Sequence, residues 1–197
     1  KFPVPDPNDL PQPANTIVSM HPPLNLFRTI GHSNTMVGPV LQLGAAVLTK
    51  TKMDPVMREL AIVRAAVLAR SDYVLNQHDE IARVVGATQE QLDALRPTPI
   101  DEGPFYKQVR AVLAFTEECL NDAKVSDETF DSVSFLNRSE IIEVMVSVGF
   151  YSMISRISET LELDIETGPN APFVAHTLAK QMAERRSALQ EEAHHRG

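Results

Sequence analysis

Residues 58–86 read RELAIVRAAVLARSDYVLNQHDEIARVVG, and this stretch decides the fold because it encodes two helices joined by a short turn. The first helix has a clear start. Asp54 can cap it, and Pro55 stands at the first helical position, where the missing N–H costs nothing. Alanines recur at helical spacing as far as Ala69, so the helix is thin and a second helix can approach it closely.

The second helix of this stretch is bounded by equally local signals. Ser71 or Asp72 can cap its start, and Gly86 is suited to a left-handed stop at its end. Thr88 and Gln91 then form a capping-box pattern for a short helix that ends before the next proline. The stretch therefore predicts a helical hairpin followed by a third, short helix.

Four polar side chains stand among the apolar residues of the predicted hairpin. They are Glu59, Tyr73, Gln77 and His78, which supply an acid, a phenol, an amide and an imidazole. Such groups can move protons on a small molecule inside a water-poor pocket. The two helices are adjacent and antiparallel, so we expect the carboxyl group of Glu59 and the ring of His78 to meet, directly or through one water. Tyr73 could donate to a developing oxyanion.

Helical periodicity continues over most of the chain, and no segment alternates convincingly like a strand, so the sequence predicts an all-α fold. Further helices are expected near residues 25–30, 36–48, 105–115, 126–135 and 137–161. A weak internal repeat places Glu59 over Glu140 and Tyr73 near Tyr151. It predicts a helical bundle built from two related helical-hairpin repeats.

Proline content suggests the domain boundaries. Residues 1–23 are rich in proline, and we expect them to form an extended arm across the surface rather than a helix. Residues 24–165 are predicted to form the helical domain. Residues 166–197 form a C-terminal tail, in which 171–197 read as a helix with a charged end.

Composition excludes several classes of protein. The chain has 197 residues, 43% of them hydrophobic, and a net charge of −8, without the basic face that a nucleic-acid binder usually shows. No apolar run is long enough to span a bilayer, and no charged-then-apolar leader opens the chain. The single cysteine, Cys119, cannot form an internal disulfide. These features predict a soluble, cytoplasmic protein with no nucleic-acid or membrane partner.

The chain resembles the carboxymuconolactone decarboxylase family, which includes the alkylhydroperoxidase-like proteins, over about residues 20–165. The matching motifs are Arg58-Glu59-Leu60, Ser71-Asp72-Tyr73 and Gln77-His78, with FRTIGHSNTM upstream and EIIEVMVSVGFY downstream. The resemblance implies an alkylhydroperoxidase-like all-α fold. It also implies a homo-oligomer, whether dimer, trimer or hexamer, with the site near a subunit interface.

One departure from the family pattern bears on the chemistry. The peroxidase branch carries a glutamate, a Cys-x-x-Cys pair and a histidine. Here the glutamate and histidine positions are Glu59 and His78, but the two cysteine positions hold Ser71 and Val74. Neither side chain can replace a redox thiol. The resemblance is therefore to the non-redox branch, which needs no metal and no organic cofactor.

The sequence thus predicts a cofactor-independent acid/base enzyme, a lyase or isomerase, acting on a small carboxylated, lactone or polyketide-like molecule of the kind found in secondary metabolism. Decarboxylation, isomerisation, dehydration and cyclisation remain open. Glu59, His78 and Tyr73 are the predicted catalytic residues. The predicted substrate-binding residues are His32, Arg64, Arg70, Gln77 and Tyr151, of which the arginines could clamp a carboxylate. A non-catalytic small-molecule-binding or scaffold protein is the alternative, and a thiol peroxidase using Cys119 is a third hypothesis.

Overall fold

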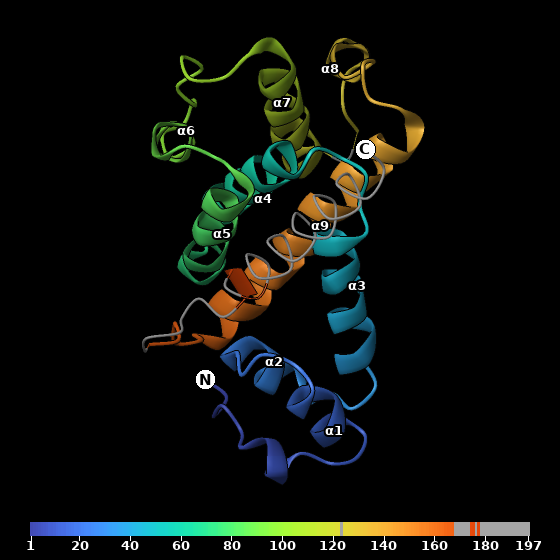
Figure 1. Cartoon of the computed structure of the whole chain (residues 1–197), viewed down its shortest axis with the longest axis vertical. Helices are drawn as coiled ribbons and strands as arrows, with labels where there is room; N and C mark the ends of the chain where they lie inside the picture. Colours follow the sequence, from blue (N-terminus) through green and yellow to red (C-terminus); the bar gives the residue numbers. More distant parts are fainter. Residues whose placement is uncertain (123, 168–173, 176, 178–197) are drawn as a thin grey trace, which may run out of the picture.

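The structure, a computed structural model, describes residues 1–122, 124–167, 174, 175 and 177. These residues form an all-α fold without strands (Figure 1), which confirms the predicted fold class. The elements in chain order are the 3-10 helix η1 (Pro7–Asp9) and the α-helices α1 (Ala14–Ser19), α2 (Asn25–Ile30), α3 (Val37–Thr49), α4 (Pro55–Ala69), α5 (Asp72–Val85), α6 (Gln89–Ala94), α7 (Lys107–Asn121), α8 (Asp127–Ser132) and α9 (Arg138–Leu161).

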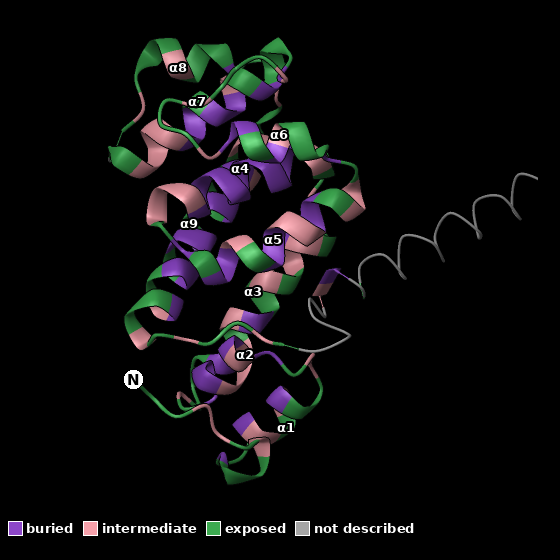
Figure 2. Cartoon of the chain, turned by 90° about the vertical axis from the view of Figure 1, so that its left-hand side faces the viewer, coloured by how far each residue is buried: buried purple, intermediate pink, exposed green. Residues whose placement is uncertain are grey.

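Helix α4 is the centre of the fold. It packs against α5, α7 and α9, and every residue from Met57 to Ala66 is buried. A helix that is buried on all sides normally carries apolar residues all round. Here three of the buried residues are ionisable, Arg58, Glu59 and Arg64, and buried charges need partners. Figure 2 shows the buried residues of α4 in purple, and these three side chains must therefore find their partners inside the protein.

The helix boundaries of the α4–α5 hairpin follow from the local signals in the sequence. The Asp54 side chain accepts a hydrogen bond from the Met57 N–H, and the Ser71 side chain accepts one from the Val74 N–H. Of the two caps considered for α5, Ser71 is thus the one used. Gly86 ends α5 with a φ of 117°, in the left-handed region that favours glycine.

Helix α9 crosses the molecule diagonally and packs against α3, α4, α5 and α7 (Figure 1). The two segments aligned as a sequence repeat take different shapes, because the first bends between α4 and α5 whereas the second lies entirely within α9. Glu140 consequently caps α9 together with Asn137, while Glu59 is buried. The expectation that no apolar run is long enough to span a bilayer is wrong for α9, which could cross a membrane by length and composition; 44% of its most apolar window is buried inside the protein.

The prediction of an extended arm over residues 1–23 is wrong, because α1 lies within it. Prolines disrupt a helix only in its interior, and α1 starts directly after Pro13 and contains none. Leu10, Ala14 and Val18 recur every four residues and are buried in the same apolar cluster as α3. This N-terminal segment is therefore part of the core.

The apolar interior has two main parts, one on each side of α4. One lies among α4, α6, α7 and the start of α9, and the other among α1, α2, α3, α5 and the end of α9. The second part contains the cavity described below. The helix predicted over 171–197 lies outside the described residues, apart from Val174, Ala175 and Thr177.

Candidate active site

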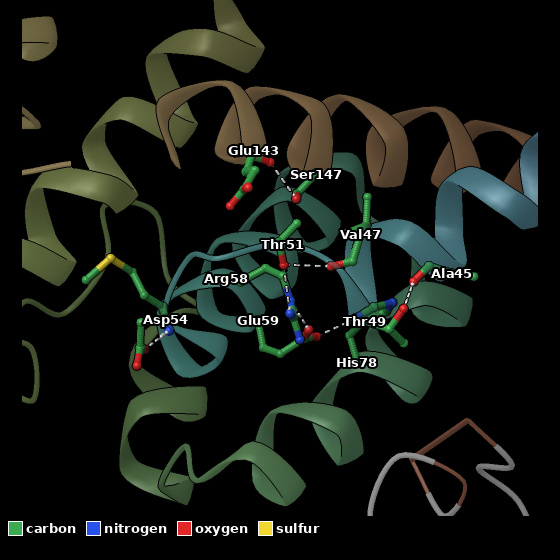
Figure 3. A network of polar contacts seen from close by, with 11 residues as sticks. Ala45, Val47, Thr49, Thr51, Asp54, Arg58, Glu59, His78, Glu143 and Ser147 are labelled. Carbon is green, nitrogen blue, oxygen red and sulfur yellow. Dashed lines mark hydrogen bonds and ion pairs between the residues drawn. The ribbon is translucent and has the colours of Figure 1, made fainter. Parts of the chain in front are cut away.

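The predicted contact between the α4 carboxyl group and the α5 imidazole is present (Figure 3). Nδ1 of His78 lies 2.8 Å from Oε2 of Glu59. Glu59 is fully buried, and only 4% of His78 is exposed. The two residues come together because α4 and α5 pack as an antiparallel pair.

The carboxylate of Glu59 is held from its other side by the neighbouring arginine. Nε of Arg58 donates to Oε1 of Glu59 at 2.8 Å, and its Nη1 donates to Oγ1 of Thr51 at 3.1 Å. The hydroxyl of Thr51 in turn donates to the Val47 carbonyl at the end of α3 (Figure 3). This polar chain, Thr51–Arg58–Glu59–His78, links α3, α4 and α5, and pairing makes the two buried charges tolerable.

The ion pair also fixes the role of each imidazole nitrogen. A carboxylate paired with Arg58 can only accept, so Nδ1 of the neutral His78 ring carries the proton and donates to Glu59. The second nitrogen, Nε2, is left to interact with whatever approaches the ring. A carboxylate that orients an imidazole in this way is a common arrangement for general acid/base catalysis.

His78 lines a partly open cavity of about 190 Å³ between α2, α3, α5 and α9, to which His21 before α2 also contributes. Most of the lining is apolar and includes Leu26, Phe27, Leu41, Ile81, Phe150 and Ile154. Tyr73, Gln77 and Tyr151 also reach the cavity, whereas Arg58 and Glu59 lie behind the wall that His78 forms. Within the described part of the chain, no lysine or arginine lines it.

Tyr151 of α9 packs edge-on against His78, with the ring centroids 4.1 Å apart. Burial raises the pKa of the Tyr151 hydroxyl, and the charge of Glu59 raises it further, while Arg58 acts in the opposite direction. Both leading effects disfavour the phenolate. Tyr151 is therefore a neutral hydroxyl donor beside the imidazole.

Tyr73 and Gln77 are both engaged by one carboxylate from the segment that follows α9. The Tyr73 hydroxyl donates to Oε1 of Glu166 at 2.6 Å, and Nε2 of Gln77 donates to Oε2 at 2.9 Å. The backbone N–H of Asn25 also donates to Glu166. Burial and then the charge of Glu166 raise the pKa of Tyr73. The Tyr73 hydroxyl, which was predicted to donate to an oxyanion, thus already donates its proton to Glu166.

The other three predicted substrate-binding residues lie outside the cavity lining. His32 is exposed, and its ring contacts the carbonyl of Pro3 and the ring of Phe2. Arg70 is exposed at the left-handed C-terminus of α4. Arg64 is fully buried, but it ties α4 to α7 and to the loop after α6.

The positions that hold cysteines in the peroxidase branch have structural roles here. The Ser71 hydroxyl caps α5 and donates to Oε1 of Glu159 at 2.8 Å, and Val74 is 2% exposed. Cys119, on α7, is half-buried outside the cavity lining, and burial raises the pKa of its thiol. A low thiol pKa and a resolving partner are the marks of a redox cysteine, so this thiol has the opposite character.

Sequence reasoning missed Glu166, which was assigned to the tail. It lies in the acidic run LELDIE (161–166), and nothing distinguishes it from its acidic neighbours. Its partners are far away in the sequence, and Tyr73 precedes it by 93 positions. Only the packing of the segment after α9 against α2 and α5 reveals the contact.

The fold and the site together define a class: an all-α domain in which a buried carboxylate orients an imidazole at the wall of an apolar cavity. Comparison with known families gives the same result as the sequence motifs. The model of the carboxymuconolactone decarboxylase family matches residues 39–118, so this part of the chain is similar to that family. The match spans α3 to α7 and so includes the whole polar chain from Thr51 to His78.

Solved structures share the fold. A protein titled as an alkylhydroperoxidase AhpD core, an uncharacterised peroxidase-related protein from Ralstonia eutropha, has a TM-score of 0.71 at 18% identity, covering 84% of this chain and 91% of its own. An uncharacterised peroxidase-related protein from Silicibacter gives 0.70 at 13%, covering 85% and 91%. A protein of unknown function from Agrobacterium tumefaciens gives 0.65 at 16%, covering 71% and 97%. No curated protein matches the sequence.

Proposed function

We propose that this chain is a cofactor-independent acid/base enzyme, a lyase or isomerase, in which His78 transfers a proton on a small organic molecule bound in the cavity. The observation that carries the proposal is the 2.8 Å contact between the buried Glu59 carboxylate and Nδ1 of His78, whose ring lines an apolar cavity. An imidazole can take a proton and return it near neutral pH.

The residues of the polar chain have separate roles in this proposal. Nε2 of His78 is the atom that meets the substrate, first as base and then as acid. Glu59 does not line the cavity, so it is a positioning residue that fixes the tautomer of His78 and stabilises the imidazolium. Arg58 and Thr51 hold Glu59 in place.

Tyr151 is the better donor for a developing enolate oxygen. Its ring contacts His78 and lines the cavity, and its raised pKa keeps the hydroxyl protonated. Tyr73, which the sequence suggested for this role, already donates to Glu166. A hydrogen bond to the enolate would lower the barrier because it strengthens as charge develops.

The cavity bears on the class of substrate. Its volume of about 190 Å³ is slightly above the roughly 150 Å³ of an engineered apolar cavity that binds benzene. A substrate with a single ring, such as an unsaturated lactone or cyclic enone, is of suitable size. The described lining holds no arginine or lysine, so a carboxylate would meet no permanently charged cation there, only the imidazoles of His21 and His78. This favours isomerisation of an uncharged substrate over decarboxylation.

The test is solvent deuterium exchange. Unsaturated five- and six-membered lactones and cyclic enones are incubated with the protein in deuterium oxide, and proton NMR follows exchange or double-bond migration. The His78→Gln variant should lose about 10²- to 10⁴-fold of the rate. His32→Gln is the matched control, because His32 is exposed outside the cavity lining, and it should keep the wild-type rate.

The alternative, a binding protein without chemistry, makes a different prediction in the same experiment. Ligands would bind equally well to the wild type and to His78→Gln, and no exchange would appear with either. That result would end the enzymatic proposal.

A further inference from the structure

The glycine at position 44 lets α3 lie close to α9. The two helices are in contact (Figure 1), and Gly44 of α3 and Phe150 of α9 both line the cavity. A Cβ atom placed on Gly44 would lie 3.2 Å from Cζ and 3.3 Å from Cε1 of Phe150. Carbon atoms in favourable contact are about 3.5–4.0 Å apart. Even a methyl group at position 44 would therefore press on the outer end of the Phe150 ring.

The backbone of α3 does not itself require this glycine. Position 44 lies in the interior of α3, where glycine is less favourable than alanine because it loses more conformational freedom on folding. Among the glycines that the structure describes, only Gly86 has a φ in the left-handed region. The close approach of Phe150 is therefore the structural reason for a residue without a side chain at this position.

The Phe150 ring cannot yield without changing the cavity. Only 8% of the residue is exposed, and its ring packs edge-on against Tyr151, with the ring centroids 5.1 Å apart. Tyr151 in turn packs edge-on against His78. Protein interiors are close-packed, and the free space that borders this ring is the cavity. A ring pushed from position 44 would thus enter the cavity or press on Tyr151.

The cavity is also larger than a bare ring requires. A cavity of roughly 150 Å³ accommodates benzene, whereas this one has about 190 Å³. The lining next to Gly44 is apolar, because Val40 and Leu41 lie one turn before it and Phe150 faces it. Such a wall favours an alkyl group over a polar one, which would lose its hydrogen bonds to water.

We propose that Gly44 determines the ligand specificity of the cavity by leaving room, beside Phe150, for a small alkyl substituent on a single-ring ligand. The inference rests on the proposed function because it names the substrate class for the same cavity. That class narrows to alkyl-substituted single-ring molecules, such as methylated lactones or cyclic enones. A larger residue at position 44 restricts the cavity to unsubstituted rings.

The test measures binding alone, by isothermal titration calorimetry. Dissociation constants of phenol and para-cresol, which differ by one methyl group, are compared among the wild type, Gly44→Ala and Gly44→Val. The methyl group should tighten binding to the wild type by about fourfold, the effect of burying one such group. This gain should shrink in Gly44→Ala and vanish in Gly44→Val, because the added side chain takes up the space.

Gly149→Ala is the matched control. It also replaces a glycine in a helix interior, next to Phe150 in the sequence, but a Cβ atom there would meet no atom within 4 Å. It should keep the fourfold gain. The double variant Gly44→Ala/Phe150→Leu should regain the preference for para-cresol, because leucine lacks the ring end that the new methyl group meets. A gain that stays lost in the double variant would contradict the role of Phe150.

A second arm, Phe150→Leu alone, leaves position 44 intact and remains informative if substitutions at Gly44 prevent folding. Removing the end of the ring enlarges the same part of the cavity. The affinity for para-ethylphenol relative to para-cresol should therefore rise by about threefold or more. The inference would be overturned by an unchanged methyl gain in Gly44→Val, by no such rise in Phe150→Leu, or by no para-cresol binding to the wild type at about 1 mM.

The outcomes for the two proposals are distinguishable. A methyl gain that depends on Gly44, together with no exchange in the wild type, would retain this inference and reject the enzymatic function. Exchange that depends on His78, together with the same methyl gain in the wild type and in Gly44→Val, would do the reverse.

Discussion

Helix α4 buries two arginines six residues apart, Arg58 and Arg64, and their surroundings differ in one respect. Each is almost inaccessible, and each pairs with a glutamate through Nε. The Nη1 and Nη2 groups of Arg64 donate to the Leu95 and Pro97 carbonyls and to the Thr98 hydroxyl, all of them protein groups. Arg58 instead pairs with Glu59, whose second oxygen holds a histidine that lines the cavity.

The difference teaches that burial and charge pairing alone do not mark a functional residue. The Arg64 cluster is closed, since its hydrogen bonds end on the backbone and on a partly exposed glutamate. The Arg58 cluster is open at one end, at Nε2 of His78. We infer that Arg64 contributes to stability and the Arg58 pair to chemistry.

The largest expected effect is on stability, in the Arg64→Met variant. Its loss leaves two carbonyls and Glu117 without their donor, which should lower the free energy of unfolding by about 3–5 kcal/mol. Urea unfolding followed by circular dichroism measures this change. The exchange rate per folded molecule should stay close to wild type. A specific loss of rate in the folded fraction would break the distinction between the two clusters.

The next effect is on rate, in Glu59→Gln. An amide can donate to Nδ1 and so favour the wrong tautomer of His78, and the exchange rate should fall by about 10²-fold or more. Because Glu59 lies outside the cavity lining, KM should change by less than about twofold. Steady-state kinetics separate the two parameters. A change confined to KM would mean that Glu59 contacts substrate.

The smallest effect is expected at Cys119. Cys119→Ser should leave both the exchange rate and any peroxide consumption unchanged, because the thiol is outside the cavity lining and its raised pKa keeps it protonated. Iodoacetamide should also modify it more slowly than it modifies glutathione at about pH 8. Peroxide turnover lost in this variant would revive the thiol peroxidase hypothesis.

The parts of the fold that could be predicted from the sequence are those set by neighbouring residues. The start of α4 is set by Asp54 and Pro55, and the start and end of α5 are set by Ser71 and Gly86. These signals act within one turn of the chain, so the sequence alone predicts them. Helix α1 was not predicted, because six residues rarely form a helix alone. It is stabilised by burying Ala14 and Val18 against the core, which is a tertiary effect.

The Glu59–His78 pair of the candidate site could be predicted from the sequence, whereas the contacts around that pair could not. Glu59 and His78 face each other because the hairpin dictates it. Arg58 and Arg64 look alike in sequence, and only the helices packed around α4 separate their roles. The contact of Glu166 with Gln77 joins residues 89 positions apart and has no local signal.

The most direct test of the central claim is the tautomer of His78, read by long-range ¹H–¹⁵N NMR at a pH where the ring is neutral. The account predicts a proton on Nδ1, held by Glu59, and an unprotonated Nε2 whose resonance shifts when para-cresol enters the cavity. A proton on Nε2, or an Nε2 resonance that responds to no ligand, would contradict it.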